Sequence, residues 1–141
     1  MFNKSVPNID EIWDNKKKTM KTINREVLEF IHIELELNVD REEAKELADQ
    51  LETDCDFYQE IDGTEYRFIQ DSEIWRIYVE EIQEVTEDCY NIETPSWLAI
   101  DWEKTAENCY VDGYGHHFSG YNGEEMEYNF GDKGWWYFRT N

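Results

Sequence analysis

Carboxylate side chains recur at helical spacing in two segments of this chain. In the first, they follow one another at steps of four, three and three residues, which places them along one helix face about 15 Å long. These residues are Glu42, Glu46, Asp49 and Glu52. The second row comprises Glu80, Glu84, Glu87 and Asp88, and a later loop carries Glu124, Glu125 and Glu127. Like charges at this spacing repel by about 0.2–0.5 kcal/mol per pair, so the rows indicate a surface that uses its charge to meet a cationic partner.

The charge of the whole chain supports that interpretation. Residues 26–141 contain 31 acidic and 7 basic side chains, a net charge of −24. Duplex DNA carries one negative charge per ~1.7 Å, so this charge matches roughly twelve base pairs, or about 40 Å of duplex. A compact chain of this length has a diameter of about 35–40 Å. The linear charge density of the domain therefore approaches that of DNA, which predicts a nucleic-acid mimic.

Other residue types point to no catalytic or metal chemistry. His116 and His117 with Cys109 form the best metal candidate, but neighbours on a strand point to opposite faces, so we predict no metal site. No nucleophile motif or phosphate-binding loop is present, and the sequence predicts neither an enzyme nor a cofactor. Trp135 and Trp136 cannot both face inward on one strand, so we expect this pair to supply an exposed interface anchor.

Composition also suggests where the protein works. Aromatic residues make up 16% of the chain, which favours a folded core over disorder. The three cysteines have spacings unlike a zinc or redox motif, which indicates a reduced protein. With no apolar run for a membrane span and no signal peptide, we expect a cytoplasmic protein with no membrane partner.

The acidic rows must be positioned by an α+β fold. Residues 1–21 are interpreted as a basic N-terminal extension, for which disorder and a functional basic arm both stay open. Residues 22–141 are interpreted as a single acidic α+β domain. We predict four helices: one beginning at Thr22, one capped by Asp40, one capped by Asp71 or Ser72 with Val85 among its inward positions, and one from Asp101 to Val111.

Strands are expected in two places. A β-hairpin between the second and third helices turns at Asp62-Gly63, with strands at 55–61 and 65–69. A small antiparallel sheet ends the chain, with short aromatic strands at 114–118, 126–130 and 135–139 separated by glycine-rich turns.

Residues 100–108, with the sequence IDWEKTAEN, precede a terminal run WYFR at 136–139. This closing segment resembles that of ArdA-type antirestriction proteins, over about a third of the chain. The resemblance implies a protein of a phage or other mobile element that imitates duplex DNA and occupies host restriction enzymes. Homodimerisation is compatible with it but does not follow from these residues.

The sequence therefore predicts a counter-defence protein that inhibits a bacterial DNA-targeting nuclease, either a restriction enzyme or a CRISPR-Cas effector. Its partner is a basic nucleic-acid-binding protein, and no direct binding of nucleic acid is expected. Two alternatives stay open. One is a small-ligand-binding or sequestering protein that uses the aromatic C-terminal sheet, and the other is a phage structural or assembly protein. Added salt separates the first alternative from mimicry, because salt screens exposed charges but not an aromatic pocket.

Overall fold

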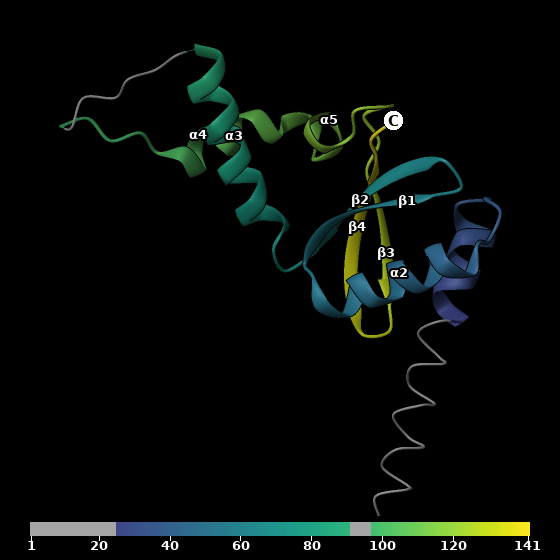
Figure 1. The fold of residues 1–141 in the computed structure, drawn as a ribbon. Helices are drawn as coiled ribbons and strands as arrows, with labels where there is room; N and C mark the ends of the chain where they lie inside the picture. Colours follow the sequence, from purple (N-terminus) through teal and green to yellow (C-terminus); the bar gives the residue numbers. More distant parts are fainter. Residues whose placement is uncertain (1–24, 91–96) are drawn as a thin grey trace, which may run out of the picture.

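A computed structural model describes residues 25–90 and 97–141. They form the α+β fold predicted from the sequence, built on a four-stranded antiparallel sheet of order β1-β2-β4-β3 (Figure 1). The strands are β1 (Asp56–Ile61), β2 (Thr64–Gln70), β3 (Met126–Phe130) and β4 (Lys133–Arg139). The helices are α2 (Arg41–Thr53), α3 (Ile74–Tyr90), α4 (Trp102–Cys109) and α5 (Gly115–Phe118), with the π-helical turn η1 (Phe30–Glu34) and the 3-10 turn η2 (Tyr110–Asp112). The predicted extension 1–21 and the start of the first helix lie outside the described residues.

Local signals place several of these elements. Asp40 caps α2 as predicted, and its carboxylate accepts hydrogen bonds from the backbone N–H groups of Glu42 and Glu43. The hairpin turns at Asp62 and Gly63, whose φ angles of 49° and 77° are the positive values that a tight two-residue turn requires. The Glu43 carboxylate accepts from the Asp62 N–H at 3.2 Å, which ties the start of α2 to this turn.

The hairpin and the C-terminal strands belong to one sheet and not to two. Strands β2 and β4 pair antiparallel, with Phe68 opposite Tyr137 and Ile69 opposite Trp136. They occupy the centre of the sheet, whereas β1 and β3 form its edges. Central strands in a sheet covered on both sides are buried on both faces, so successive residues of β2 and β4 enter two different cores.

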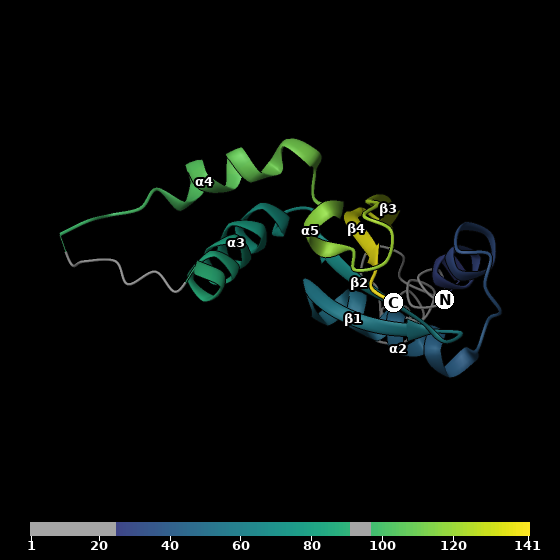
Figure 2. The ribbon, with the colours of Figure 1, turned by 90° about the horizontal axis from the view of Figure 1, so that it is seen from above.

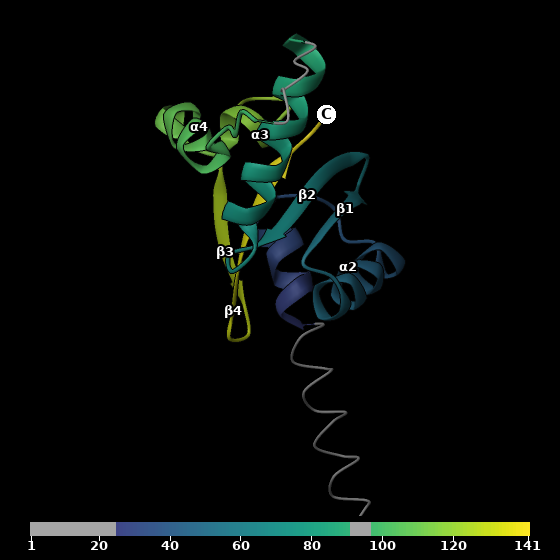
Figure 3. The ribbon, with the colours of Figure 1, turned by 90° about the vertical axis from the view of Figure 1, so that its left-hand side faces the viewer.

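Helices cover both faces of the sheet (Figure 3). On the first face, the first helix, whose described part is residues 25–34, packs with α2 around Phe30. The Phe30 ring centre lies 4.9 Å from that of Phe130 and 5.0 Å from that of Tyr137. On the second face, α3, α4 and α5 bury Ile69 and Phe138. Figure 2 shows α3 and α4 side by side on this second face.

Three expectations from the sequence are wrong in detail. Residues 115–118 are helical in α5 instead of forming a strand. Val85 is 48% exposed, because the C-terminal part of α3 extends past the buried Ile82. Trp135 is 1% exposed within the first core and cannot be an interface anchor, and its neighbour Trp136 is half-buried on the second face. Both tryptophans therefore face inward, because the sheet has helices on both sides.

Truncating Trp135 is expected to be severely destabilising. Trp135→Ala removes a fully buried indole that contacts Phe57, and should lower the free energy of unfolding by about 3–5 kcal/mol. The matched control is Trp97→Ala, because Trp97 is 82% exposed and its loss should change the free energy by less than about 0.5 kcal/mol. Urea unfolding followed by circular dichroism measures both values, and equal losses for the two variants would contradict this packing.

Candidate functional site

The predicted carboxylate row on α2 is exposed on a rigid helix. Four apolar side chains of α2 are buried in the first core, and they fix the opposite face toward solvent: Ala44, Leu47, Ala48 and Leu51. The row itself, Glu42, Glu46, Asp49 and Glu52, is exposed throughout. None of the four forms an ion pair with another described residue. Among the residues that the structure describes, only Glu46 of this row has a side-chain partner: the Gln59 amide donates to its carboxylate at 3.1 Å.

The second row lies on α3 and is partly neutralised. Glu80, Glu84, Glu87 and Asp88 are all exposed. However, Arg76 donates to Glu80 at 3.0 Å and to Glu73 at 2.9 Å, which offsets charge near the start of the row. The Glu87 carboxylate accepts from the Gln83 amide. The α3 row therefore presents less uncompensated charge than the α2 row.

The loop carboxylates have separate roles. Glu124, Glu125 and Glu127 are exposed. Glu125 accepts a hydrogen bond from the Tyr114 backbone N–H at 2.9 Å. Its carboxylate also lies close to Gly113, because a Cβ atom added to that glycine would be only 2.7 Å from a carboxylate oxygen. It thus joins the loop before β3 to the segment between α4 and α5. Glu127 lies on edge strand β3 opposite Trp136, on the face covered by α3, α4 and α5.

The structure does not gather the predicted carboxylates into one patch. Helix α2 packs on the first face of the sheet and α3 on the second, so their outward rows lie on opposite sides of the molecule (Figures 1 and 3). A single flat partner surface can contact only one of these rows. The two rows are separate candidate interfaces.

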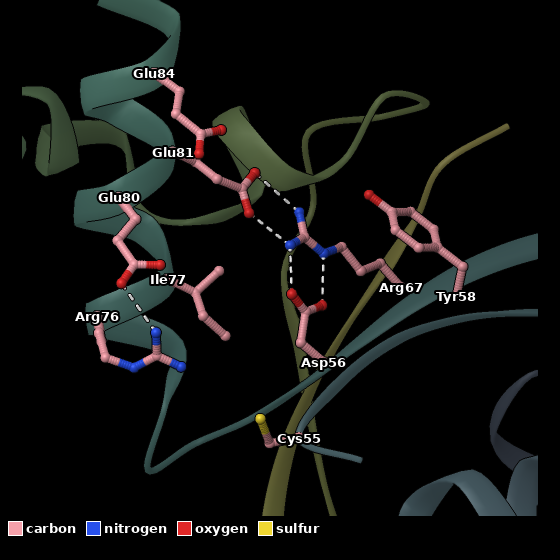
Figure 4. Close-up of a pocket in the computed structure, with 9 residues that line it drawn as sticks. All are labelled: Cys55, Asp56, Tyr58, Arg67, Arg76, Ile77, Glu80, Glu81 and Glu84. Atoms are coloured by element: carbon pink, nitrogen blue, oxygen red, sulfur yellow. Dashed lines mark hydrogen bonds and ion pairs between the residues drawn. The ribbon is translucent and has the colours of Figure 1, made fainter.

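A buried ion network beside α3 was not predicted from the sequence (Figure 4). Arg67 on β2 has a side chain that is 9% exposed, and it donates to the Asp56 carboxylate through Nε at 2.8 Å and Nη2 at 2.7 Å. Its Nη1 donates to Glu81 of α3 at 3.0 Å. The Nε2 atom of His117 lies 3.1 Å from the same Glu81 oxygen. The network joins β1, β2, α3 and α5.

The partners of Arg67 account for its burial. The guanidinium carbon lies 4.9 Å from the Phe118 ring centre and 5.3 Å from that of Tyr58, so both aromatic rings cover it. Burial alone lowers the pKa of Arg67, but hydrogen bonds to Asp56 and Glu81 outweigh burial and leave the pKa raised. Burial alone raises the pKa of Glu81. The hydrogen bonds with His117 and Arg67 outweigh burial and lower the pKa from 4.5 to about 2.

A pocket of about 460 Å³ opens beside this network (Figure 4). Three members of the network line it, Asp56, Arg67 and Glu81, together with Cys55, Tyr58, Arg76, Ile77, Glu80 and Glu84. Four carboxylates and two guanidinium groups line it, so its charged groups are mostly anionic. Tyr58 is 55% exposed and stands at this pocket with the exposed Glu80 and Glu84 of the α3 row. The exposed aromatic side chain of this surface is therefore Tyr58, which the sequence did not single out.

Acid titration should expose the contribution of Glu81. Because its folded pKa lies below its ordinary value of 4.5, Glu81 stabilises the fold above about pH 4.5, and that contribution is lost as the pH falls toward 2. Protonation of the many other carboxylates relieves repulsion over the same range, so a comparison is needed. The free-energy difference between wild type and Glu81→Gln, from urea midpoints at pH 7, 4.5 and 2.5, should shrink as the pH falls. A difference that stays constant with pH would contradict the role given to Glu81.

Within residues 25–90 and 97–141, no three His, Cys, Asp or Glu side chains are grouped as ligands for one metal ion. His116 is exposed and His117 contacts Glu81, and both lie on a helix where a strand was expected. No helix within the same ranges has the length and apolar character needed to cross a bilayer.

Comparison of the chain with protein-family models, with curated proteins and with solved structures gives no match.

Proposed function

We propose that this protein inhibits a bacterial DNA-targeting nuclease by placing the carboxylates of α2 where the nuclease binds DNA phosphates. The observation that carries the proposal is the exposed α2 row, whose four carboxylates form no ion pair with another described residue. Nucleases owe much of their DNA affinity to phosphate contacts with lysine and arginine. Carboxylates on a rigid surface compete for those cations without any reading of bases.

The construction of α2 supports this role. A helix of 13 residues is about 20 Å long, and the row occupies most of that length. The Asp40 cap and the buried stripe hold the helix in place before any partner arrives. A preorganised charged surface loses little conformational entropy on binding. The charge that the fold tolerates on α2 is therefore available for fast, electrostatically steered association.

The α3 row is the secondary site in this proposal. Arg76 offsets the charge of Glu80 at its start, and the row lies on the opposite side of the sheet from α2. A partner that closes around the protein would contact both rows, whereas a partner with one open groove would contact α2 alone. In the first case, Tyr58 beside the α3 row would be the aromatic interface anchor, the role that the sequence analysis assigned to Trp135 and Trp136.

The partner class follows from the same chemistry. The surface fits a lysine- and arginine-lined DNA groove of a restriction enzyme or a CRISPR-Cas effector. The resemblance of residues 100–108 and 136–139 to ArdA-type antirestriction proteins supports a phage or mobile-element origin. Such a protein acts in the cytoplasm of the host bacterium, with no cofactor and no direct contact with nucleic acid.

DNA-cleavage assays with purified enzymes test the proposal. Restriction enzymes and Cas effectors are each titrated with the protein at fixed DNA concentration. We expect inhibition of at least one enzyme, with a midpoint that rises as non-cleavable duplex DNA is added, because DNA and protein compete for one groove. Inhibition that excess DNA does not relieve would exclude mimicry at the DNA site, and an absence of inhibition throughout such a panel would count against the nuclease as partner.

A further inference from the structure

An apolar groove lies between the first helix and α2, away from the pocket beside α3. Two adjoining hollows of about 480 and 310 Å³ share Leu28 and Arg41 in their lining. Ile33 and Val39 line the first hollow, and Ala44 lines the second. Leu28, Ile33 and Val39 are 37%, 68% and 38% exposed, so aliphatic surface is open to water along the groove.

The edge of this groove is cationic in a strongly acidic protein. Arg41 and Lys45, one helical turn apart on α2, contribute to its lining. Within residues 25–90 and 97–141, neither of them forms an ion pair with a carboxylate. The acidic Glu29 at the groove is itself paired with Arg25 at 3.4 Å. The groove therefore suits an occupant that has aliphatic or aromatic side chains on one side and carboxylates on the other.

The chain contains a segment with that composition. Residues 9–14, IDEIWD, place apolar side chains at steps of three and one residues, Ile9, Ile12 and Trp13. The other three residues of the segment are carboxylates: Asp10 and Glu11 lie between Ile9 and Ile12, and Asp14 follows Trp13. The segment precedes the first described residue, Arg25, which lies one helical turn before Leu28 of the groove. Eleven residue steps from position 14 to position 25 span at most about 36–40 Å, which allows the segment to reach the groove.

We propose that residues 9–14 of the same chain dock in the groove between the first helix and α2. Ile9, Ile12 and Trp13 cover the aliphatic side chains, and the carboxylates meet Arg41 and Lys45. Attachment through a short linker gives such a segment an effective concentration in the millimolar range, so a modest intrinsic affinity suffices. This inference does not depend on the proposed nuclease partner.

Methyl NMR of the full chain tests the docking. The ring of Trp13 shifts nearby methyl signals, so Trp13→Ala should move those of Leu28, Ile33 and Val39 while leaving Ile69 and Ile74 of the second core in place. Trp97→Ala, which removes an exposed tryptophan elsewhere, should leave the groove signals unchanged. Groove signals that Trp13→Ala does not move would overturn the proposal. Signals that depend on protein concentration would assign the segment to a second copy and overturn docking within one chain.

Charge exchange supplies an independent test. The double variant Arg41→Glu with Lys45→Glu should shift the groove signals in the direction seen for Trp13→Ala, because the edge then repels the segment. Adding Asp10→Lys, Glu11→Lys and Asp14→Lys to that variant should restore the wild-type pattern. Failure of the combined variant to restore it would show that the charges do not hold the segment there.

Discussion

Replacing the four carboxylates of the α2 row by lysine is expected to abolish nuclease inhibition, with a loss of affinity of at least about a hundredfold. The variant carries Glu42→Lys, Glu46→Lys, Asp49→Lys and Glu52→Lys. Each substitution turns an attraction to the DNA groove into a repulsion, and like-charge contacts in an interface cost several kcal/mol, where 1.4 kcal/mol is a tenfold change. Inhibition midpoints and direct binding to the inhibited enzyme measure the loss.

A second quadruple variant separates position from total charge. Glu36, Glu103, Glu107 and Asp132 are exposed and lie outside both rows, so replacing them by lysine changes the net charge equally. We expect this control to weaken inhibition only slightly, through reduced long-range steering. Both variants should keep the wild-type circular dichroism spectrum, because the eight positions are on the surface. Equal losses in the two variants would mean that bulk charge and not α2 is responsible, and intact inhibition in the first would remove α2 as the site.

Replacing Arg67 by methionine is expected to lower the free energy of unfolding by about 3 kcal/mol or more. The substitution keeps much of the side-chain volume but leaves Asp56 and Glu81 facing each other without their shared cation. Removing one partner of a buried ion pair costs about 3–5 kcal/mol, because the charge that remains is desolvated and uncompensated. Here the carboxylates are partly exposed, each with 27% of its side-chain surface accessible, which favours the lower end of that range.

The comparison with an exposed ion pair makes this result specific. Lys104 and Glu107 lie 3.5 Å apart on α4 with most of their surface in water. Lys104→Met should therefore cost less than about 1 kcal/mol. Neutralising the orphaned groups, by adding Asp56→Asn and Glu81→Gln to Arg67→Met, should recover part of the lost stability. Urea midpoints measure all three variants. A similar loss for Arg67→Met and Lys104→Met would contradict a network that joins α3 to the sheet.

Features governed by neighbouring residues were predictable from the sequence. The Asp40 cap, the hairpin turn at Asp62 and Gly63, and strand β3 occur where the local patterns placed them. A helix also begins beside Asp101, as predicted, although Asp101 is its N-cap and not its first residue. The α2 row was also predictable as an exposed face, because the buried stripe on the other side of the helix repeats with helical period. In each case a few adjacent residues determine the conformation.

Features that depend on distant pairing were not predictable. Nothing local indicates that β2 pairs with β4, yet that pairing joins the two predicted sheets and buries Trp135. Arg67 finds its partners 11 and 14 residues away, and Glu81 reaches His117 across 36 residues. The one local hint was an arginine between aromatic residues in a strand, which signals a buried cation only once both faces of the sheet are known to be covered. For the same reason, the sequence did not show that α2 and α3 lie on opposite faces of the sheet.

Salt dependence of binding tests the central claim most directly, that carboxylates on this protein replace DNA phosphates. The affinity for the inhibited nuclease is measured between about 50 and 500 mM salt, where the screening length falls from above 10 Å toward about 4 Å. We predict a steep loss of affinity across this range, and a shallower dependence for any residual binding by the α2 lysine variant. An affinity that does not change with salt would contradict mimicry and place the interface on uncharged surface.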